Sequence, residues 1–147
     1  MGTRSYIGIE DSDGTISGIY CHWDGYPEGV GAILRDFYGD PDRVRKLVAG
    51  GDLSILGPDT EPAEGVAHSF DKPADGVCVY YARDRGEAVR GAPRCIDAGA
   101  FATAAAQAGA EFVYVLRGKE RWFFAPITTR GVGQWRRLTE DATTAAD

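Results

Sequence analysis

The chain has 147 residues, of which 44% are hydrophobic, 26% charged and 11% aromatic. This size and mixture fit one soluble domain and leave no room for a second, so we expect a single domain over residues 1–138 and a disordered tail over residues 139–147. The formal net charge of −6 argues against sequence-independent binding to duplex nucleic acid, which needs a basic surface.

The sequence also argues against membrane and secreted classes of protein. No stretch approaches the roughly 20 apolar residues of a membrane-spanning helix, and the first residues lack the apolar segment of a secretory signal. The three cysteines, Cys21, Cys78 and Cys95, include no Cys-x-x-Cys pair, so neither a disulfide framework nor a cysteine zinc site is expected. We expect a cytoplasmic protein with reduced thiols and no bound cofactor.

The first half of the chain predicts a hairpin followed by two helices. The predicted strands cover residues 5–10 and 15–23, and the predicted helices cover residues 27–38 and 40–50. A turn signal with Gly14 joins the strands. Pro27 and Pro41 suit the first turns of the helices, and Asp40 is the expected N-cap residue of the second.

The second half predicts a long loop, a helix and a second hairpin. We expect a surface loop over residues 57–76, strands over residues 77–82, 111–116 and 121–126, a helix over residues 97–108, and an edge strand over residues 134–138. This order of elements excludes a series of parallel βαβ units. It predicts an α+β fold, a mostly antiparallel sheet of two hairpins and a middle strand, with about three helices packed on one face.

The segment CHWDGYPEGVG, residues 21–31, is the first candidate site. Free N–H groups at a helix start, with glycines beside them, can admit a phosphate or carboxylate. The candidate binding residues here are His22, Trp23, Asp24, Tyr26 and Glu28. An ordinary joint between a strand and a helix is the alternative explanation of the same pattern. It is favoured by the absence of both glycine-rich phosphate-loop motifs.

Histidine chemistry is a second interpretation of the same segment. His22 could act as a general base if Asp24 oriented it and raised its pKa, which makes these two the candidate catalytic residues. A metal site would have to draw on His22, Asp24, Glu28 and His68. Because these residues show no recognisable ligand spacing, no metal is predicted.

The second candidate site is at residues 80–87, where arginines and acids alternate after a pair of tyrosines. Tyr81 could stack on a base while Arg83 and Arg85 hold phosphates, and Arg4 is a further candidate. A surface ladder that satisfies its own charges is the simpler alternative. A ligand site requires this segment and residues 21–31 to face one cavity.

Several of these segments together resemble a family of small uncharacterised bacteriophage and prophage proteins. The resemblance covers roughly residues 1 to 90 and rests on the segments at residues 1–5, 20–31, 51–54, 56–58 and 81–87. It implies a phage setting, in which small accessory proteins inhibit host factors or sequester nucleotide-derived defence signals. It supplies no catalytic residues.

These observations predict a binding protein rather than an enzyme. The expected ligand is a small, anionic, nucleotide-like molecule held by rings and arginines. A homo-oligomer is also expected, whose interface would supply further walls of the pocket. One alternative is a small hydrolase or phosphodiesterase that uses His22 and Asp24. Another is an inhibitor of a host protein that acts through an exposed aromatic patch or sheet edge.

Overall fold

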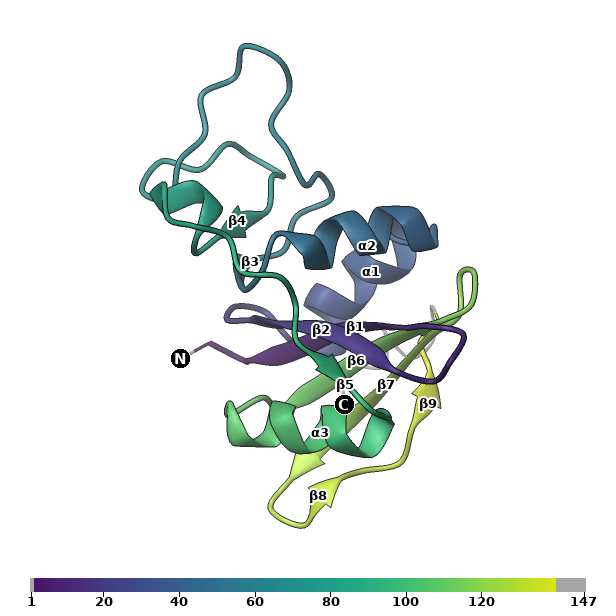
Figure 1. Cartoon of the computed structure of the whole chain (residues 1–147). Helices are drawn as coiled ribbons and strands as arrows, with labels where there is room; N and C mark the ends of the chain where they lie inside the picture. Colours follow the sequence, from purple (N-terminus) through teal and green to yellow (C-terminus); the bar gives the residue numbers. More distant parts are fainter. Residues whose placement is uncertain (1, 140–147) are drawn as a thin grey trace.

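The structure, a computed structural model, describes residues 2–139 and has the predicted α+β class (Figure 1). The strands are β1 (Ser5–Glu10), β2 (Ile16–Cys21), β3 (Leu53–Ile55), β4 (Val79–Tyr80), β5 (Arg94–Cys95), β6 (Phe112–Arg117), β7 (Trp122–Thr128), β8 (Gly131–Val132) and β9 (Arg136–Arg137). The helices are α1 (Ala32–Phe37), α2 (Pro41–Ala49) and α3 (Ala98–Gln107). Short π-helical and 3₁₀ turns cover Pro27–Gly31 and Arg83–Arg85.

The two predicted hairpins are present and lie side by side in one sheet. The strand order is β4-β3-β2-β1-β6-β7-β8, with β5 paired to β2 and β9 paired to β7. The hairpins β1–β2 and β6–β7 are antiparallel, and they meet through a parallel pairing of β1 with β6. β2 also pairs in parallel with β3. The sheet is therefore mixed but mostly antiparallel, as predicted.

α2 and α3 begin directly after capping aspartates, whereas the predicted helix over residues 27–38 starts with a π-helical turn and is α-helical only from Ala32. The side chain of Asp40 accepts a hydrogen bond from the backbone N–H of Asp42 at the start of α2. The side chain of Asp97 accepts one from Ala100 N–H, 2.9 Å away, at the start of α3. Each carboxylate satisfies a donor that the first helical turn leaves free.

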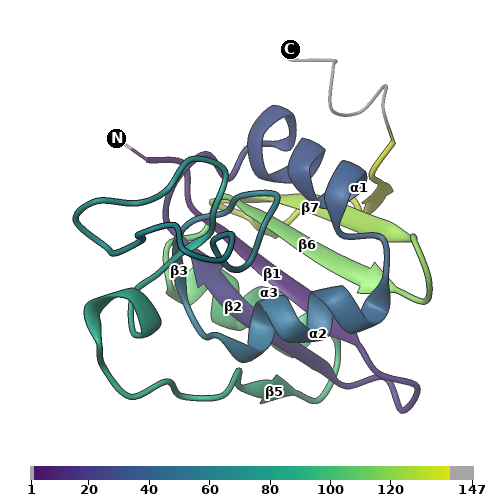
Figure 2. The same ribbon diagram turned by 90° about the horizontal axis from the view of Figure 1, so that it is seen from above.

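The prediction that all helices pack on one face is wrong. α1 and α2 cover one face of the sheet and α3 covers the other, as the side view and the view from above both show (Figures 1 and 2). The reason lies in β6, where Val113, Tyr114, Val115 and Leu116 are all buried. The even-numbered pair belongs to the core beneath α1 and α2, and the valines belong to the core with Phe101 of α3. A strand that is apolar on both sides needs cover on both sides.

Very short strands are the other difference from the prediction. β3, β5 and β8 were not predicted, and β4 occupies only two residues of the predicted strand 77–82. Segments of two or three residues carry no measurable periodicity. The predicted tail, beyond Thr139, lies outside the described residues. None of the helices within residues 2–139 is long and apolar enough to cross a membrane.

Candidate functional site

The α3-facing side of the β1–β2 hairpin is only partly covered by α3. Phe101 lies directly on two glycines of this hairpin: a Cβ added at Gly18 would stand 2.2 Å from Phe101 Cε1, and one at Gly8 would stand 2.8 Å from Phe101 Cζ. Tyr6 and Tyr20, next along the same face, are only half-buried. The absence of side chains at the glycines thus lets α3 lie on the Gly8–Gly18 pair in the middle of the hairpin, and Tyr6 and Tyr20 beyond it stay accessible.

Aromatic rings run from Phe101 along this accessible part in a continuous series of contacts. Ring centroids are 5.7 Å apart for Tyr6 and Phe101, 6.2 Å for Tyr6 and Tyr20, 5.9 Å for Tyr20 and His22, and 4.8 Å for His22 and Trp23. We call Tyr6, Tyr20, His22 and Trp23 the aromatic row. Trp23 is 42% exposed, so its ring is available as a stacking surface.

The tyrosine hydroxyls in the row stay protonated in neutral solution. Burial, with the nearby carboxylate of Asp52, raises the pKa of Tyr6. Burial also raises the pKa of Tyr20, although the charge of Arg4 partly opposes it. The Tyr20 hydroxyl lies 2.7 Å from His22 Nδ1, which fixes the orientation of the imidazole ring.

Arg4 stands at the outer end of the aromatic row. A hollow of about 440 Å³ here is lined by Gly2, Arg4, His22, Trp23, Gly109 and Glu111. The guanidinium lies over the backbone of Gly109, whose added Cβ would be 3.0 Å from Arg4 Nη1. Glu111 accepts the backbone N–H of Arg4, and within residues 2–139 the guanidinium itself forms no ion pair. We call this the Arg4 hollow; it combines an unpaired cation with two aromatic rings.

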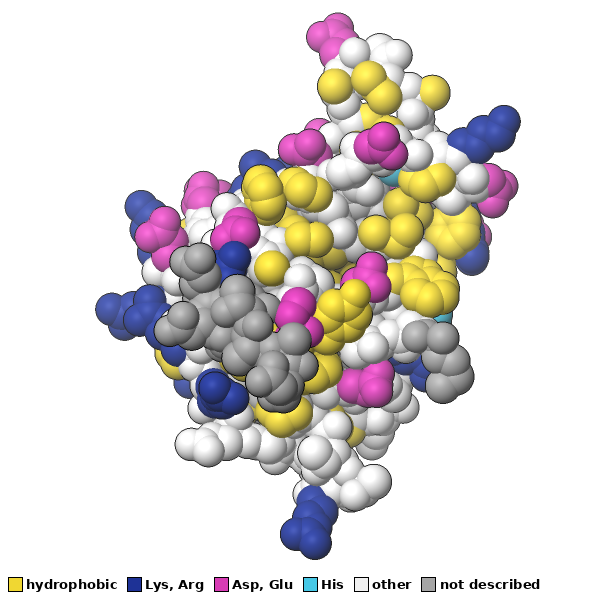
Figure 3. Space-filling view, turned by 180° about the vertical axis from the view of Figure 1, so that it is seen from behind, with side chains coloured by type: hydrophobic (Ala, Val, Ile, Leu, Met, Phe, Trp, Pro, Cys, Tyr) yellow, Lys and Arg dark blue, Asp and Glu magenta, His cyan; other side chains and the backbone are white. Residues whose placement is uncertain are grey.

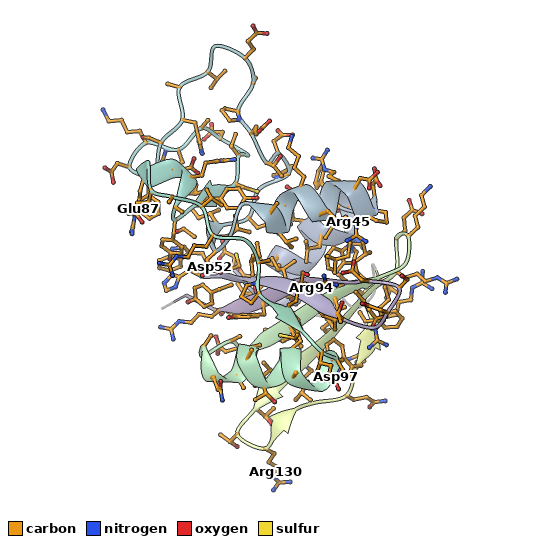
Figure 4. All side chains as sticks on the ribbon, viewed as in Figure 1. Arg45, Asp52, Glu87, Arg94, Asp97 and Arg130 are labelled. Carbon is orange, nitrogen blue, oxygen red and sulfur yellow. The ribbon has the colours of Figure 1, made fainter. Side chains whose placement is uncertain are left out.

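A second hollow, of about 580 Å³, lies at the other end of the row. Its lining comprises Tyr6, Gly18, Ile19, Gly51, Asp52, Tyr81, Ala82, Glu87, Ala88, Arg90, Gly91, Ala92 and Pro93. Residues 87–93 form a strap that runs from the region of β4 down to β5 (Figure 1). Asp52 and Glu87 stand on the strap side of the molecule (Figure 4). We call this space the β2 gap. The strap and Asp52 were not predicted from the sequence. Gly51 is the one local sign of the strap, since a Cβ added there would stand 3.3 Å from the backbone oxygen of Arg90.

The second predicted segment does not present its arginines to either hollow. Arg83 donates to Asp84, and its guanidinium also donates to the backbone oxygen of Thr60. Arg85 lies over the rings of Phe70 and Tyr81, 4.2 Å and 5.1 Å from their centroids. Of the predicted residues after β4, only Tyr81 lines a hollow. The alternative of a ladder that satisfies its own charges describes Arg83, which pairs with Asp84, whereas Arg85 is held by the two rings instead of by an acid.

The predicted pair of His22 and Asp24 is not formed. His22 Nδ1 is bonded to the Tyr20 hydroxyl, whereas Asp24 Oδ1 accepts from the Tyr26 hydroxyl at 3.2 Å. His22, Asp24 and Arg83 therefore lie in three separate hydrogen-bonded settings instead of facing one cavity. Glu28 is exposed in the π-helical turn that follows. The part of the site that the structure does assemble consists of Arg4, His22 and Trp23, with Tyr81 across the β2 gap.

The second histidine is a structural residue of the long loop. The side chain of His68 is 3% exposed. Its Nδ1 accepts the backbone N–H of Ala74 at 2.9 Å, so Nε2 carries the proton and donates to Cys78 O at 3.1 Å and to Asp84 Oδ2 at 3.2 Å. The loop is thus tied internally at this residue. These contacts were not predicted, because the partners lie 6, 10 and 16 residues further along an irregular loop that has no periodic pattern.

Asp84 collects the hydrogen bonds that hold this loop to β4. Its carboxylate accepts from Arg83 Nε at 2.8 Å and from the backbone N–H of Tyr80 at 2.8 Å, besides His68. Burial alone would raise the pKa of Asp84, but the hydrogen bonds from Arg83 and Tyr80 outweigh it and lower the pKa below its ordinary value. The ionised form is therefore favoured in the folded protein.

We expect Asp84→Asn to lower the free energy of unfolding at neutral pH by about 1.5 kcal/mol, the scale of one charge-assisted hydrogen bond. The contribution of the ionised group is complete above the unfolded pKa of about 3.9 and is lost as pH falls through the lower folded pKa. Urea unfolding between neutral pH and acid measures both effects. Asp75→Asn, at an exposed position, is the matched control and should leave the free energy of unfolding unchanged at every pH. If the free energy of unfolding of Asp84→Asn falls with acid as steeply as that of the wild type, the ionised Asp84 carboxylate does not stabilise the fold.

Comparison with models of known protein families, with curated proteins and with solved structures finds no match to this chain. The residues that bear on function are therefore those of the two hollows and of the aromatic row between them.

Proposed function

We propose that this protein binds a small, anionic, nucleotide-like molecule on the aromatic row and holds it without cleaving it. The observation that carries the proposal is the guanidinium of Arg4, which forms no ion pair with any residue from 2 to 139 and stands beside the rings of His22 and Trp23. An arginine fork suits phosphate oxygens, and an aromatic ring offers a face to a base. The row continues through Tyr20 and Tyr6 into the β2 gap, so a ligand can contact several rings at once.

Retention without cleavage is favoured by the partner of His22. A general base needs an accessible ring nitrogen oriented by a second group, commonly a carboxylate. Here a tyrosine hydroxyl is bonded to Nδ1, and the nearest carboxylate in the sequence, Asp24, is bonded to Tyr26. The histidine is therefore better suited to contact a phosphate than to activate water.

Among the described residues, the back of the molecule lacks the continuous basic surface that a broad polyanion needs. On the back of the molecule, acidic and basic side chains are both scattered among apolar ones (Figure 3). An extended nucleic-acid site would gather lysines and arginines along one face. One arginine beside two rings, as in the Arg4 hollow, is an arrangement that suits one phosphate group.

Isothermal titration with a panel of nucleotides tests the proposal. The resemblance to phage proteins makes cyclic nucleotides and ADP-ribose derivatives the first members of the panel, followed by nucleoside mono- and diphosphates. We expect at least one member to bind, and chromatography after heating the complex should return that ligand unchanged. A protein that binds no member of the panel, or that returns a cleaved ligand, would contradict the proposal. Light scattering in the same samples tests the predicted homo-oligomer.

A further inference from the structure

We infer that the ligand lies along β2, with a nucleoside in the β2 gap read by Asp52 and with its phosphate in the Arg4 hollow. The inference rests on the proposed function and adds to it the direction of the ligand and the residue that selects the nucleoside. It depends on three features of the gap: its backbone edge, its charge, and its distance from Arg4.

The gap exists because the outer edge of β2 has strand neighbours only at its two ends. β3 pairs with it at Cys21, and β5 pairs with it at Ile16 and Ser17. Between them, Gly18 N–H donates to Pro93 O at 3.3 Å and Tyr20 N–H donates to Asp52 Oδ1 at 3.0 Å. The amide donors that a docking peptide strand would need are already paired. A small molecule is therefore a better occupant than a β-strand.

The walls of the gap suit a flat ligand that carries hydrogen-bond donors. Two carboxylates, Asp52 and Glu87, and one guanidinium, Arg90, line it together with small residues such as Gly18 and Gly91. Carboxylates accept hydrogen bonds and do not donate them when ionised. They match the hydroxyls of a ribose or the amino group of a base, whereas they repel a phosphate. Tyr6 and Tyr81 add ring faces to the same walls.

The Arg4 hollow suits an anion better than the gap does. Its one carboxylate, Glu111, is bonded to the backbone N–H of Arg4 and is balanced by the Arg4 guanidinium, whereas the gap has two carboxylates and one guanidinium. The hollow also lies at a suitable distance. Gly18 borders the gap and His22 borders the Arg4 hollow. Four residues of extended strand span roughly 13 Å, so one ligand that reaches both hollows must be longer than a base or a phosphate alone. Its donor-rich end belongs at Asp52 and its anionic end at Arg4. Nucleoside monophosphates have this polarity.

Asp52→Asn is the variant that tests this orientation. An asparagine keeps Oδ1 as an acceptor for Tyr20 N–H, so the sheet edge is retained while the negative charge is lost. Titrations use adenosine 5′-monophosphate, adenosine and inorganic phosphate, and are repeated with the guanine, cytosine and uracil compounds. Asp75→Asn is the matched control, because Asp75 is exposed and borders neither hollow. Thermal unfolding verifies that all variants are folded.

We expect Asp52→Asn to weaken the best nucleoside monophosphate and its nucleoside by the same factor, about tenfold, and to leave the affinity for phosphate unchanged. Failure of every monophosphate and nucleoside to bind the wild-type protein would overturn the inference. So would a monophosphate whose affinity changes less than twofold in Asp52→Asn. Binding elsewhere in the wider nucleotide panel would still uphold the proposed function in either case, which separates the two failures.

Discussion

Replacing Phe101 by alanine is expected to lower the free energy of unfolding by about 3–5 kcal/mol. Phe101 is 1% exposed and belongs to the core between α3 and the sheet, with Ile16, Val113 and Val115. Its ring rests on Gly18 and Gly8, which have no side chains to move into the vacated space. The truncation therefore removes buried apolar surface and also leaves a cavity that collapses poorly.

Urea unfolding followed by circular dichroism measures this loss, and Phe37→Ala is the matched control. Phe37 lies at the end of α1 and is 47% exposed, so its truncation should change the free energy of unfolding by about 0.5 kcal/mol or less. A Phe101→Ala protein within 1 kcal/mol of the wild type would mean that α3 does not seal this face of the sheet. The description of the aromatic row as the part left uncovered would then be wrong.

Arg4→Gln is expected to weaken binding of the nucleotide ligand by about 10- to 100-fold, which corresponds to about 1.5–3 kcal/mol for a charge-assisted hydrogen bond. The guanidinium is exposed and has no ion pair within the described chain, so all of its hydrogen-bonding capacity is available to a phosphate. Glutamine keeps a polar side chain of similar reach but loses the charge. Isothermal titration with the best ligand of the panel measures the effect.

The control for this variant is Arg130→Gln. Arg130 is an exposed arginine between β7 and β8 and lies far from Asp52 (Figure 4). We expect the affinity of Arg130→Gln for the ligand to equal that of the wild type. Both variants should keep the wild-type midpoint of thermal unfolding. If the affinity of Arg4→Gln for the ligand is within twofold of the wild-type affinity, the phosphate does not bind in the Arg4 hollow.

The hairpins and helices could be predicted because their signals are local. The two strands of β1–β2 flank a tight turn, and Asp40 and Asp97 cap helices through their nearest backbone neighbours. The hairpin register also explains why Arg4 and His22, two of the residues predicted from the sequence, line the same hollow. Ser5 pairs with Cys21, so Arg4 and His22, one residue further along each strand, lie near one another.

The remainder of the site depends on contacts between distant parts of the chain. Arg83 and Arg85 resemble ligand-binding arginines in the sequence, but Asp84 and a ring of the long loop, Phe70, engage them. Asp52 borders the β2 gap only because the chain after α2 returns to the edge of β2, where it accepts Tyr20 N–H. Neither outcome follows from residue type and spacing, because each requires the path of a loop.

The layering of the helices shows the same limit for the fold. Four consecutive buried residues of β6 carry the evidence that the sheet is covered on both sides. Residues 111–116 were predicted as a strand with alternating apolar and polar residues. Such a strand needs helices on one face only, so the helix over residues 97–108 was expected on the same face as the other two. The error matters for function, since the aromatic row lies on the face that α3 covers only in part.

Chemical-shift mapping tests the central claim, that a ligand binds between Arg4 and the β2 gap, most directly. Backbone amide spectra of the ¹⁵N-labelled protein are recorded while the best nucleotide of the panel is added. We predict that the largest changes fall on Arg4, Gly18, Tyr20, His22 and Gly91, with little change at Gly131. Saturable changes confined to the loop of residues 57–76, or to the far hairpin β6–β7, would contradict the account.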